Sequence, residues 1–235
     1  MIKRFSVLCV FVFCVGQISA QALLQDTISG SQSIAKSDAL YLVKDFPQGV
    51  YKTYDALLQK SGINMGDAIE RKTIVGYKTV PKEVTADHVF FAWTRNGIKL
   101  TDFFAISYNG NLYIQQRYLE QFAIKADKNQ AGDNPNSYHR VVNDGKFFYL
   151  EGPFANAWSK AFAYGSGGAV GGAIGANLNR LKGVVFDVEK KECNFIRSCE
   201  DLNLLIEKYN GVKIECKEKD VDLLVIRENI AKIEK

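Results

Sequence analysis

The chain has few of the residues on which most enzyme chemistry depends. It contains only two histidines, His88 and His139, and neither has a metal-ligand partner at a recognised spacing. His88 begins an apolar run and His139 lies on a predicted hairpin arm, which are positions typical of structural histidines. The sequence therefore predicts no catalytic residue, no cofactor and no metal ion.

Nucleotide-binding loops and the serine nucleophile elbow are also missing. A dinucleotide fingerprint needs a glycine five residues after its first, and after Gly165 and Gly167 that position holds Val170. None of the glycines in this segment is followed by the lysine of a P-loop. Ser166 lacks the glycine of an elbow two residues earlier, where Tyr164 stands. The sequence thus excludes the common phosphate-cradle and esterase motifs.

Long runs of one charge are absent, and charged residues of both signs alternate along the chain. The formal charge is +4, and it falls to +2 if a leader that carries Lys3 and Arg4 is removed. Interspersed charge is typical of an ordinary solvated surface, so we expect no nucleic-acid partner. Only four prolines and 12% aromatic residues indicate a folded chain rather than a linker.

The first twenty residues have the pattern of a secretory signal. A basic start is followed by an apolar run from Phe5 to Val15 and by the small residue Ala20. This run is too short for a permanent membrane helix, which needs about 20 apolar residues. We therefore predict a signal peptide over residues 1–20 that is cleaved after Ala20, a flexible arm over 21–37, and a soluble secreted or periplasmic product.

Three cysteines remain after cleavage, and an odd number allows one disulfide and one free thiol. Cys216 continues an alternation with Val212 and Ile214 that predicts an inward-facing strand, so one interpretation makes it a buried packing residue. The disulfide that we consider joins Cys193 and Cys199. A thiol nucleophile is conceivable from the residue types, but no surrounding motif supports one.

Residues 38–150 are predicted to form a β-rich region that starts with a short helix. Thr53 can cap a helix that runs through Leu58 and ends before Gly62. The apolar run 88–93 has the length and composition of a strand.

Two hairpins are predicted further along this region. The arms 103–108 and 111–116 flank Asn109-Gly110, the dipeptide that supplies the two positive φ angles of a primed turn. A less strict copy has the arms 139–142 and 146–150. Successive strands without intervening helices favour an antiparallel meander or a small barrel.

Residues 151–235 are predicted to hold a glycine-rich helix and a C-terminal αβ portion. Two strands, over 183–188 and 193–196, flank a polar turn. Ser198 begins a helix that Gly211 ends, and the apolar residues of 223–233 follow one helical stripe. The predicted fold class is therefore α+β, with an N-terminal helix, a meander or small barrel, the glycine-rich helix and this αβ portion.

Residues 161–179 carry no charge and contain glycines at a spacing of four. On a helix they would form a flat ridge that another backbone could approach closely. The ridge consists of Gly167, Gly168, Gly171, Gly172 and Gly175. Three interpretations remain open: a helix packed within the same protein, a membrane-associating or self-associating helix, and a flexible loop.

Tyrosines around the predicted hairpins are a second source of candidate binding residues. Tyrosine is favoured in binding faces because it combines a large rigid ring with a polar tip. The candidates are Tyr108, Tyr113, Tyr118 and Tyr149. The alternative is that these rings fill one side of the sheet and cover the other.

The stretch from Phe46 to Leu57, which includes Phe-Pro-Gln-Gly-Val-Tyr-Lys-Thr, resembles the opening of a group of uncharacterised exported proteins common in Bacteroidota. The run 183–188, followed by a polar turn and a leucine-rich helix, is similar to their C-terminal part. The resemblance implies an envelope protein of unknown function and supplies no catalytic residue.

These features favour an exported envelope protein that binds a partner or ligand without transforming it. The first alternative is a membrane-associated or self-associating protein that acts through residues 161–179. A hydrolase with an unrecognised site is a more distant alternative. The sequence identifies neither the ligand or envelope partner nor the oligomeric state.

Overall fold

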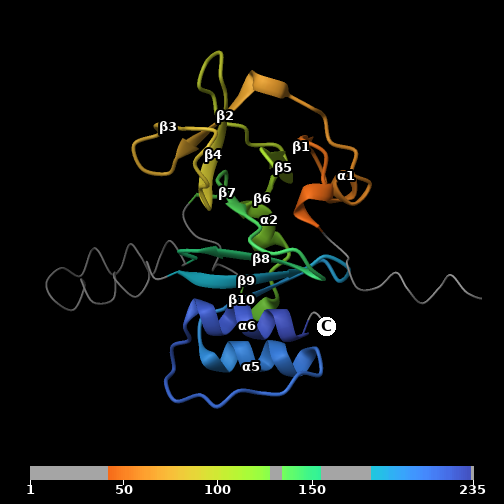
Figure 1. The fold of residues 1–235 in the computed structure, drawn as a ribbon, viewed down its shortest axis with the longest axis vertical. Coiled ribbons are helices and arrows are strands. Elements are labelled where there is room, and N and C mark those ends of the chain that lie inside the picture. Colours follow the sequence, from red (N-terminus) through yellow and green to blue (C-terminus); the bar gives the residue numbers. More distant parts are fainter. Residues whose placement is uncertain (1–41, 128–133, 155–180, 234–235) are drawn as a thin grey trace, which may run out of the picture. The chain divides into compact units, whose positions relative to one another are not determined.

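The structure is a computed structural model, and it describes residues 42–127, 134–154 and 181–233 (Figure 1). The predicted signal peptide over 1–20, the arm over 21–37 and the glycine ridge within 161–179 lie outside the described residues. Residues 37–235 are assigned to one compact unit.

Seven strands form an antiparallel sheet that curves into a half-barrel. Their order across the sheet is β1-β5-β6-β7-β4-β2-β3. This order is not sequential, so the sheet is neither a simple meander nor a closed barrel. The strands are β1 (Gly49–Tyr51), β2 (Ile69–Thr73), β3 (Thr79–Val80), β4 (His88–Trp93), β5 (Ala105–Tyr108), β6 (Asn111–Gln115) and β7 (Tyr138–Arg140).

The hairpin around Asn109-Gly110 is confirmed. Strands β5 and β6 pair antiparallel, with Tyr108 opposite Asn111 at the turn. Asn109 has a φ of 55° and Gly110 a φ of 71°, the positive values that a two-residue primed turn requires. Local turn chemistry therefore determines the register of the two central strands.

The second predicted hairpin is wrong, because its two arms join different sheets. Strand β7 pairs with β6 and β4, whereas β8 (Phe147–Gly152) pairs with β9 (Lys182–Asp187). The intended arms are joined by an isolated antiparallel bridge between Val141 and Leu150 and by a backbone hydrogen bond of 2.9 Å from Val142 N to Tyr149 O. Strand β10 (Glu192–Ile196) completes a three-stranded sheet in the order β10-β9-β8.

Helices are short before the second sheet and longer after it. The expected N-terminal helix is only α1 (Tyr54–Leu58), a five-residue element whose Thr53 side chain accepts a hydrogen bond from the backbone of Ala56. No longer helix precedes the half-barrel within the described residues, so an N-terminal helix is not a major part of this fold. The remaining short elements are α2 (Gln116–Gln121), η1 (Val43–Asp45), η2 (Gly66–Ala68) and η3 (Lys125–Asp127).

The C-terminal helices α5 (Cys199–Lys208) and α6 (Leu223–Ile233) agree with the predicted boundaries. Ser198 caps α5 by accepting a hydrogen bond from the backbone of Asp201 at 3.1 Å. Helix α6 is fixed to β8 by Arg227, whose guanidinium donates two hydrogen bonds of 2.7 Å to Glu151. Both helices lie against the three-stranded sheet (Figure 1).

The three-stranded sheet separates two hydrophobic cores. Phe148 and Phe186 face a core shared with the half-barrel, together with Tyr54 of α1. Tyr149 and Val185 alternate with them and face the core under α5 and α6. Every residue of β8 is buried, which is typical of a strand covered on both faces.

The disulfide joins Cys199 and Cys216, not Cys193 and Cys199 as predicted. Their Cα atoms are 5.8 Å apart, while Cys193 is buried in the shared core as a free thiol. The strand predicted around Cys216 does not form, and Val212 is 90% exposed. Residues 211–222 instead form a loop that the disulfide ties to the first turn of α5, closing a chain segment with a sequence separation of 17.

The two sheets meet where Gly152 of β8 lies against His139 of β7. A Cβ atom at position 152 would lie 2.7 Å from His139 Cε1 and 3.1 Å from the ring of Phe154. We therefore expect Gly152→Ala to lower the free energy of unfolding by about 1–3 kcal/mol, because a buried ring must move. Urea denaturation measures this change.

The control is His139→Ala, alone and combined with Gly152→Ala. If the clash is the cause, removing the ring makes the two effects less than additive. Strictly additive losses would contradict a direct contact between these two positions.

Candidate functional site

A pocket of about 250 Å³ lies between β10, α5 and the segment that contains η3. It combines an apolar wall with six polar or charged side chains. The lining residues are Ile124, Asp127, Glu192, Asn194, Phe195, Arg197, Asp201, Leu204, Leu205 and Lys208.

Two regular periodicities bring the pocket residues together. Glu192 and Asn194 are two residues apart on β10, so they share one face of the strand. Asp201, Leu205 and Lys208 follow each other at helical spacing on α5 and so share one face of the helix. The register of α5 on β10 places these two faces at the same pocket.

Asp127 closes the edge of β10 next to the pocket. Its Oδ2 accepts a hydrogen bond of 3.0 Å from the backbone N–H of Phe195. Just before it, the backbone of Ile124 donates to Cys193 O, and Cys193 N donates to Phe122 O. A carboxylate therefore satisfies a strand-edge donor that a neighbouring strand would otherwise use.

The Arg197 guanidinium links two acidic residues at the pocket. It donates to Asp201 through Nε at 3.1 Å and through Nη2 at 3.0 Å. The same Nη2 lies 3.0 Å from Asp127 Oδ1 as an ion pair. Burial raises the pKa of Asp127, while the Phe195 N–H and the Arg197 charge act in the opposite direction.

A second ion pair lies at the other end of the pocket. Lys208 pairs with Glu192, and it also donates to Asn194 Oδ1 at 3.3 Å. Both cations of the pocket are therefore paired with carboxylates that also line it.

Two buried polar atoms of the pocket residues keep unused hydrogen-bonding capacity. Asn194 is 9% exposed, and its Nδ2 has no hydrogen-bond partner among the described residues. Asp127 is 2% exposed, and its Oδ1 accepts no hydrogen bond within that same part of the chain, although Arg197 lies beside it. An unpaired buried donor costs about 1–3 kcal/mol, so Asn194 Nδ2 is an open donor, whereas Asp127 Oδ1 is ion-paired with Arg197 and keeps capacity for a further hydrogen bond.

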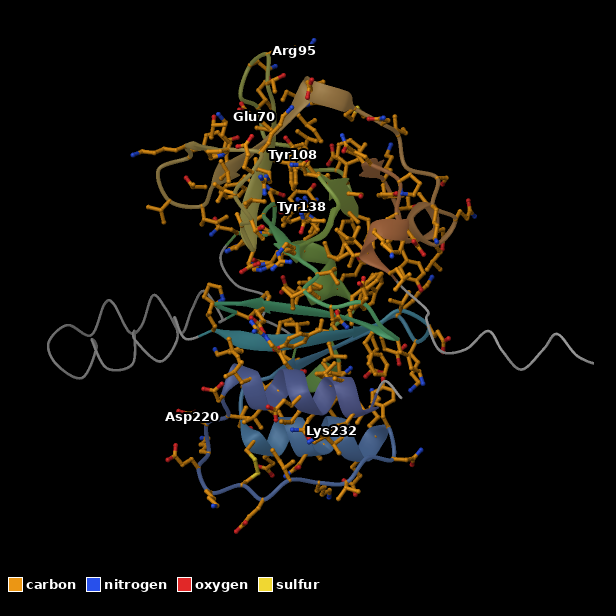
Figure 2. The ribbon with its side chains drawn as sticks, in the orientation of Figure 1. Glu70, Arg95, Tyr108, Tyr138, Asp220 and Lys232 are labelled. Carbon is orange, nitrogen blue, oxygen red and sulfur yellow. A yellow bond between two sulfur atoms is a disulfide. The ribbon has the colours of Figure 1, made fainter. Side chains whose placement is uncertain are left out.

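The tyrosines predicted as binding residues belong to the interior. Tyr108, Tyr113 and Tyr149 are at most 5% exposed, and Tyr118 packs against the shared core. Figure 2 shows Tyr108 within the side chains of the half-barrel. Three of these rings are therefore interior side chains, and Tyr118 is partly buried.

The two histidines stack on each other at the junction of the two sheets. Their ring centroids are 4.0 Å apart, and His139 Nε2 lies 2.9 Å from the side-chain amide of Gln116. His139 Nδ1 faces the carbonyl of Glu151 at 3.4 Å. Burial, together with the neighbouring His88, lowers the pKa of His139 well below 6.5. His139 is therefore a neutral structural residue at ordinary pH.

His88 and Ser137 are the closest approach to a nucleophile and base pair. His88 Nε2 lies 2.7 Å from Ser137 Oγ, but Ser137 is fully buried and also donates to Asn134 O. Burial likewise raises the pKa of the Cys193 thiol, which keeps it protonated. Neither group can meet a substrate, so this arrangement gives no support to a hydrolase.

Within the described residues, no three histidine, cysteine or carboxylate side chains are grouped so that they could hold a metal ion. In the same part of the chain, no helix is long and apolar enough to span a membrane. The glycine ridge falls outside that part, so its packing stays a prediction.

Comparison with protein families gives one match, which covers residues 49–220. The chain belongs to a family of unknown function, DUF6563. No curated protein and no solved structure matches the chain. All ten residues of the pocket lie within the DUF6563 region.

Sequence reasoning did not find this pocket. It identified Ser198 as the residue that begins a helix. The spacing of Asp201 and Lys208 on one face of α5 was a usable signal. The contact between Asp127 and Phe195 spans 68 residues, and no local pattern predicts it.

We expect the neutral state of His139 to make stability fall in mild acid. The unfolded chain takes up a proton near pH 6.5, whereas the folded chain does so only at much lower pH. Between pH 7 and pH 5 the free energy of unfolding should therefore decrease, by up to about 1.4 kcal/mol per pH unit from this group.

The matched variant is His139→Gln, which keeps a hydrogen-bonding side chain but does not titrate. Urea denaturation at several pH values should show a shallower slope in the variant. Equal slopes in the two proteins would show that His139 does not carry the effect.

Proposed function

We propose that this DUF6563 protein is an exported, non-enzymatic binding protein of the cell envelope. It holds a small polar ligand in the pocket between β10 and α5. The observation that carries the proposal is the buried Asn194 Nδ2, which has no hydrogen-bond partner among the described residues and lies on a residue that lines the pocket beside the ion-paired Asp127. Buried polar groups in folded proteins are almost always paired, so an exception at a pocket points to a ligand or to bound water.

The other features of the pocket support binding rather than catalysis. Acid–base catalysis needs two titratable groups whose surroundings shift their pKa values apart. It also needs a space beside them for the reacting atom of the substrate. Here the charged groups are held in fixed pairs, Arg197 with Asp201 and Lys208 with Glu192. Such pairs give the pocket a defined shape.

Export is supported by three independent features. The first is the predicted leader over residues 1–20, and the second is the resemblance to exported proteins of Bacteroidota at Phe46–Leu57. The third is the Cys199–Cys216 disulfide, since such bonds persist in oxidising compartments and are rare in the cytoplasm. The alternative, membrane contact through residues 161–179, rests on the sequence alone.

Export is tested by expressing the full chain in a bacterium with an intact secretion pathway. We expect the mature protein to begin at Gln21, to carry the Cys199–Cys216 linkage in non-reducing peptide mapping, and to enter the wash of the fractionated envelope. An intact chain that begins at Met1 in the cytoplasm would contradict export. Retention in the washed membrane would favour contact through residues 161–179.

Binding is tested by thermal denaturation of the mature protein against a panel of small neutral, anionic and cationic compounds. We expect at least one class to raise the melting temperature, because a ligand that binds only the folded state stabilises it. Leu204→Asp should abolish the shift, since Leu204 lines the pocket and is 60% exposed, so the substitution spares the core. A shift that is unchanged in Leu204→Asp would place binding elsewhere.

A further inference from the structure

We propose that the ligand of the β10–α5 pocket is a neutral sugar residue, bound through its hydroxyl groups. This inference rests on the proposed function, because it names the ligand class of the same pocket. Four features of the pocket carry it: the pairing of its charges, its two buried polar atoms, its apolar wall and its size.

The pairing of charges disfavours an ionic ligand. Arg197 contacts both Asp127 and Asp201, and Lys208 contacts Glu192. An anion would need a free cation, but each cation here is already neutralised by a carboxylate within ion-pair distance. A cationic ligand would have to compete with Arg197 for the buried Asp127 or with Lys208 for Glu192. A neutral ligand avoids both costs, since it leaves the ion pairs intact.

The two polar atoms are best satisfied by a ligand that both donates and accepts hydrogen bonds. Asn194 Nδ2 offers an open donor, and Asp127 Oδ1, which is ion-paired with Arg197, offers a further acceptor position. A hydroxyl group carries one donor and two acceptor positions, and it rotates to suit its surroundings. Neighbouring hydroxyl groups on one rigid ring supply both donors and acceptors with little loss of conformational freedom.

The wall of the pocket suits the less polar face of such a ring. Leu204 and Leu205 line one side, and Leu204 is 60% exposed beside the polar groups. A pyranose ring has this division, because its hydroxyl groups lie around an edge while its C–H groups form an apolar face. Burial of that face against leucine adds hydrophobic stabilisation to the hydrogen bonds.

The volume of the pocket limits how much of a ligand it can enclose. Its volume of about 250 Å³ is below the roughly 300 Å³ at which sites for drug-sized ligands begin. A single sugar residue is therefore the expected occupant, and longer glycans would extend from it into solvent.

The test is isothermal titration calorimetry of the mature protein with methyl glycosides of glucose, galactose and mannose, and with N-acetylglucosamine. Glucuronate and glucosamine serve as the anionic and cationic analogues, and N-acetylglycinamide as a neutral amide that is not a sugar. We expect at least one neutral sugar to bind with a dissociation constant in the millimolar range or better. Its charged analogues and the amide should bind at least about tenfold more weakly.

Three variants locate the binding. Asn194→Asp keeps the shape of the side chain but removes the open donor, and Leu204→Asp removes the apolar wall. Each should weaken sugar binding at least about tenfold. Glu200→Gln is the matched control, since Glu200 is exposed on the same helix and does not line the pocket, and it should bind like the wild type. If Asn194→Asp does not fold, Leu204→Asp still tests the proposal, because Leu204 is exposed.

The outcomes separate this inference from the proposed function. Equal or tighter binding of a charged analogue or of the amide would overturn the neutral sugar but leave the pocket as a binding site. Sugar binding that Leu204→Asp does not change would also overturn it, because the sugar would then lie elsewhere. If neither the sugars nor the broader panel of compounds bind, both this inference and the proposed pocket function fail.

Discussion

Strands β8 and β9 are buried on both faces, and the rest of the described structure depends on this double burial. Phe148 and Phe186 face the core shared with the half-barrel, while Tyr149 and Val185 face the core under α5 and α6. Full burial of one such apolar side chain contributes about 1.5–3 kcal/mol. Removing either the half-barrel or the helices α5 and α6 would expose one face of β8 and β9 to water. The half-barrel and the C-terminal helices are thus linked through the sheet between them.

Strand β10, the third strand of that sheet, is under a different constraint, because it lies at an edge of the sheet. Unpaired edge groups invite association with other chains, and proteins usually cover or charge them. Here Asp127 covers the edge by accepting from the Phe195 N–H, and Arg197 connects it to α5. The Asp127 carboxylate occupies less space than a further strand would, and the pocket lies beside this carboxylate. The proposed binding site is therefore a consequence of how the sheet edge is closed.

Elements that depend on neighbouring residues were predictable from the sequence, and those that depend on distant pairing were not. Asn109-Gly110 forms the expected hairpin, and Ser198 caps the expected helix. The similar turn at 143–145 joins its arms only through an isolated bridge and a few hydrogen bonds, and its two strands belong to different sheets: β7 pairs with β6 and β4, while β8 pairs with β9. Similar local signals therefore gave different outcomes, because pairing with strands far apart in the chain decided the second case.

The sequence by itself determined the α+β class, the central hairpin, the strand pair β9–β10 and the two C-terminal helices. Turn and cap chemistry acts over a few residues, and so the sequence carries it directly. Only the tertiary structure decided that Cys199 pairs with Cys216, that the tyrosines lie inside, and that Asp127 reaches β10. These outcomes follow from which faces become buried together, and that depends on contacts between residues far apart in the chain.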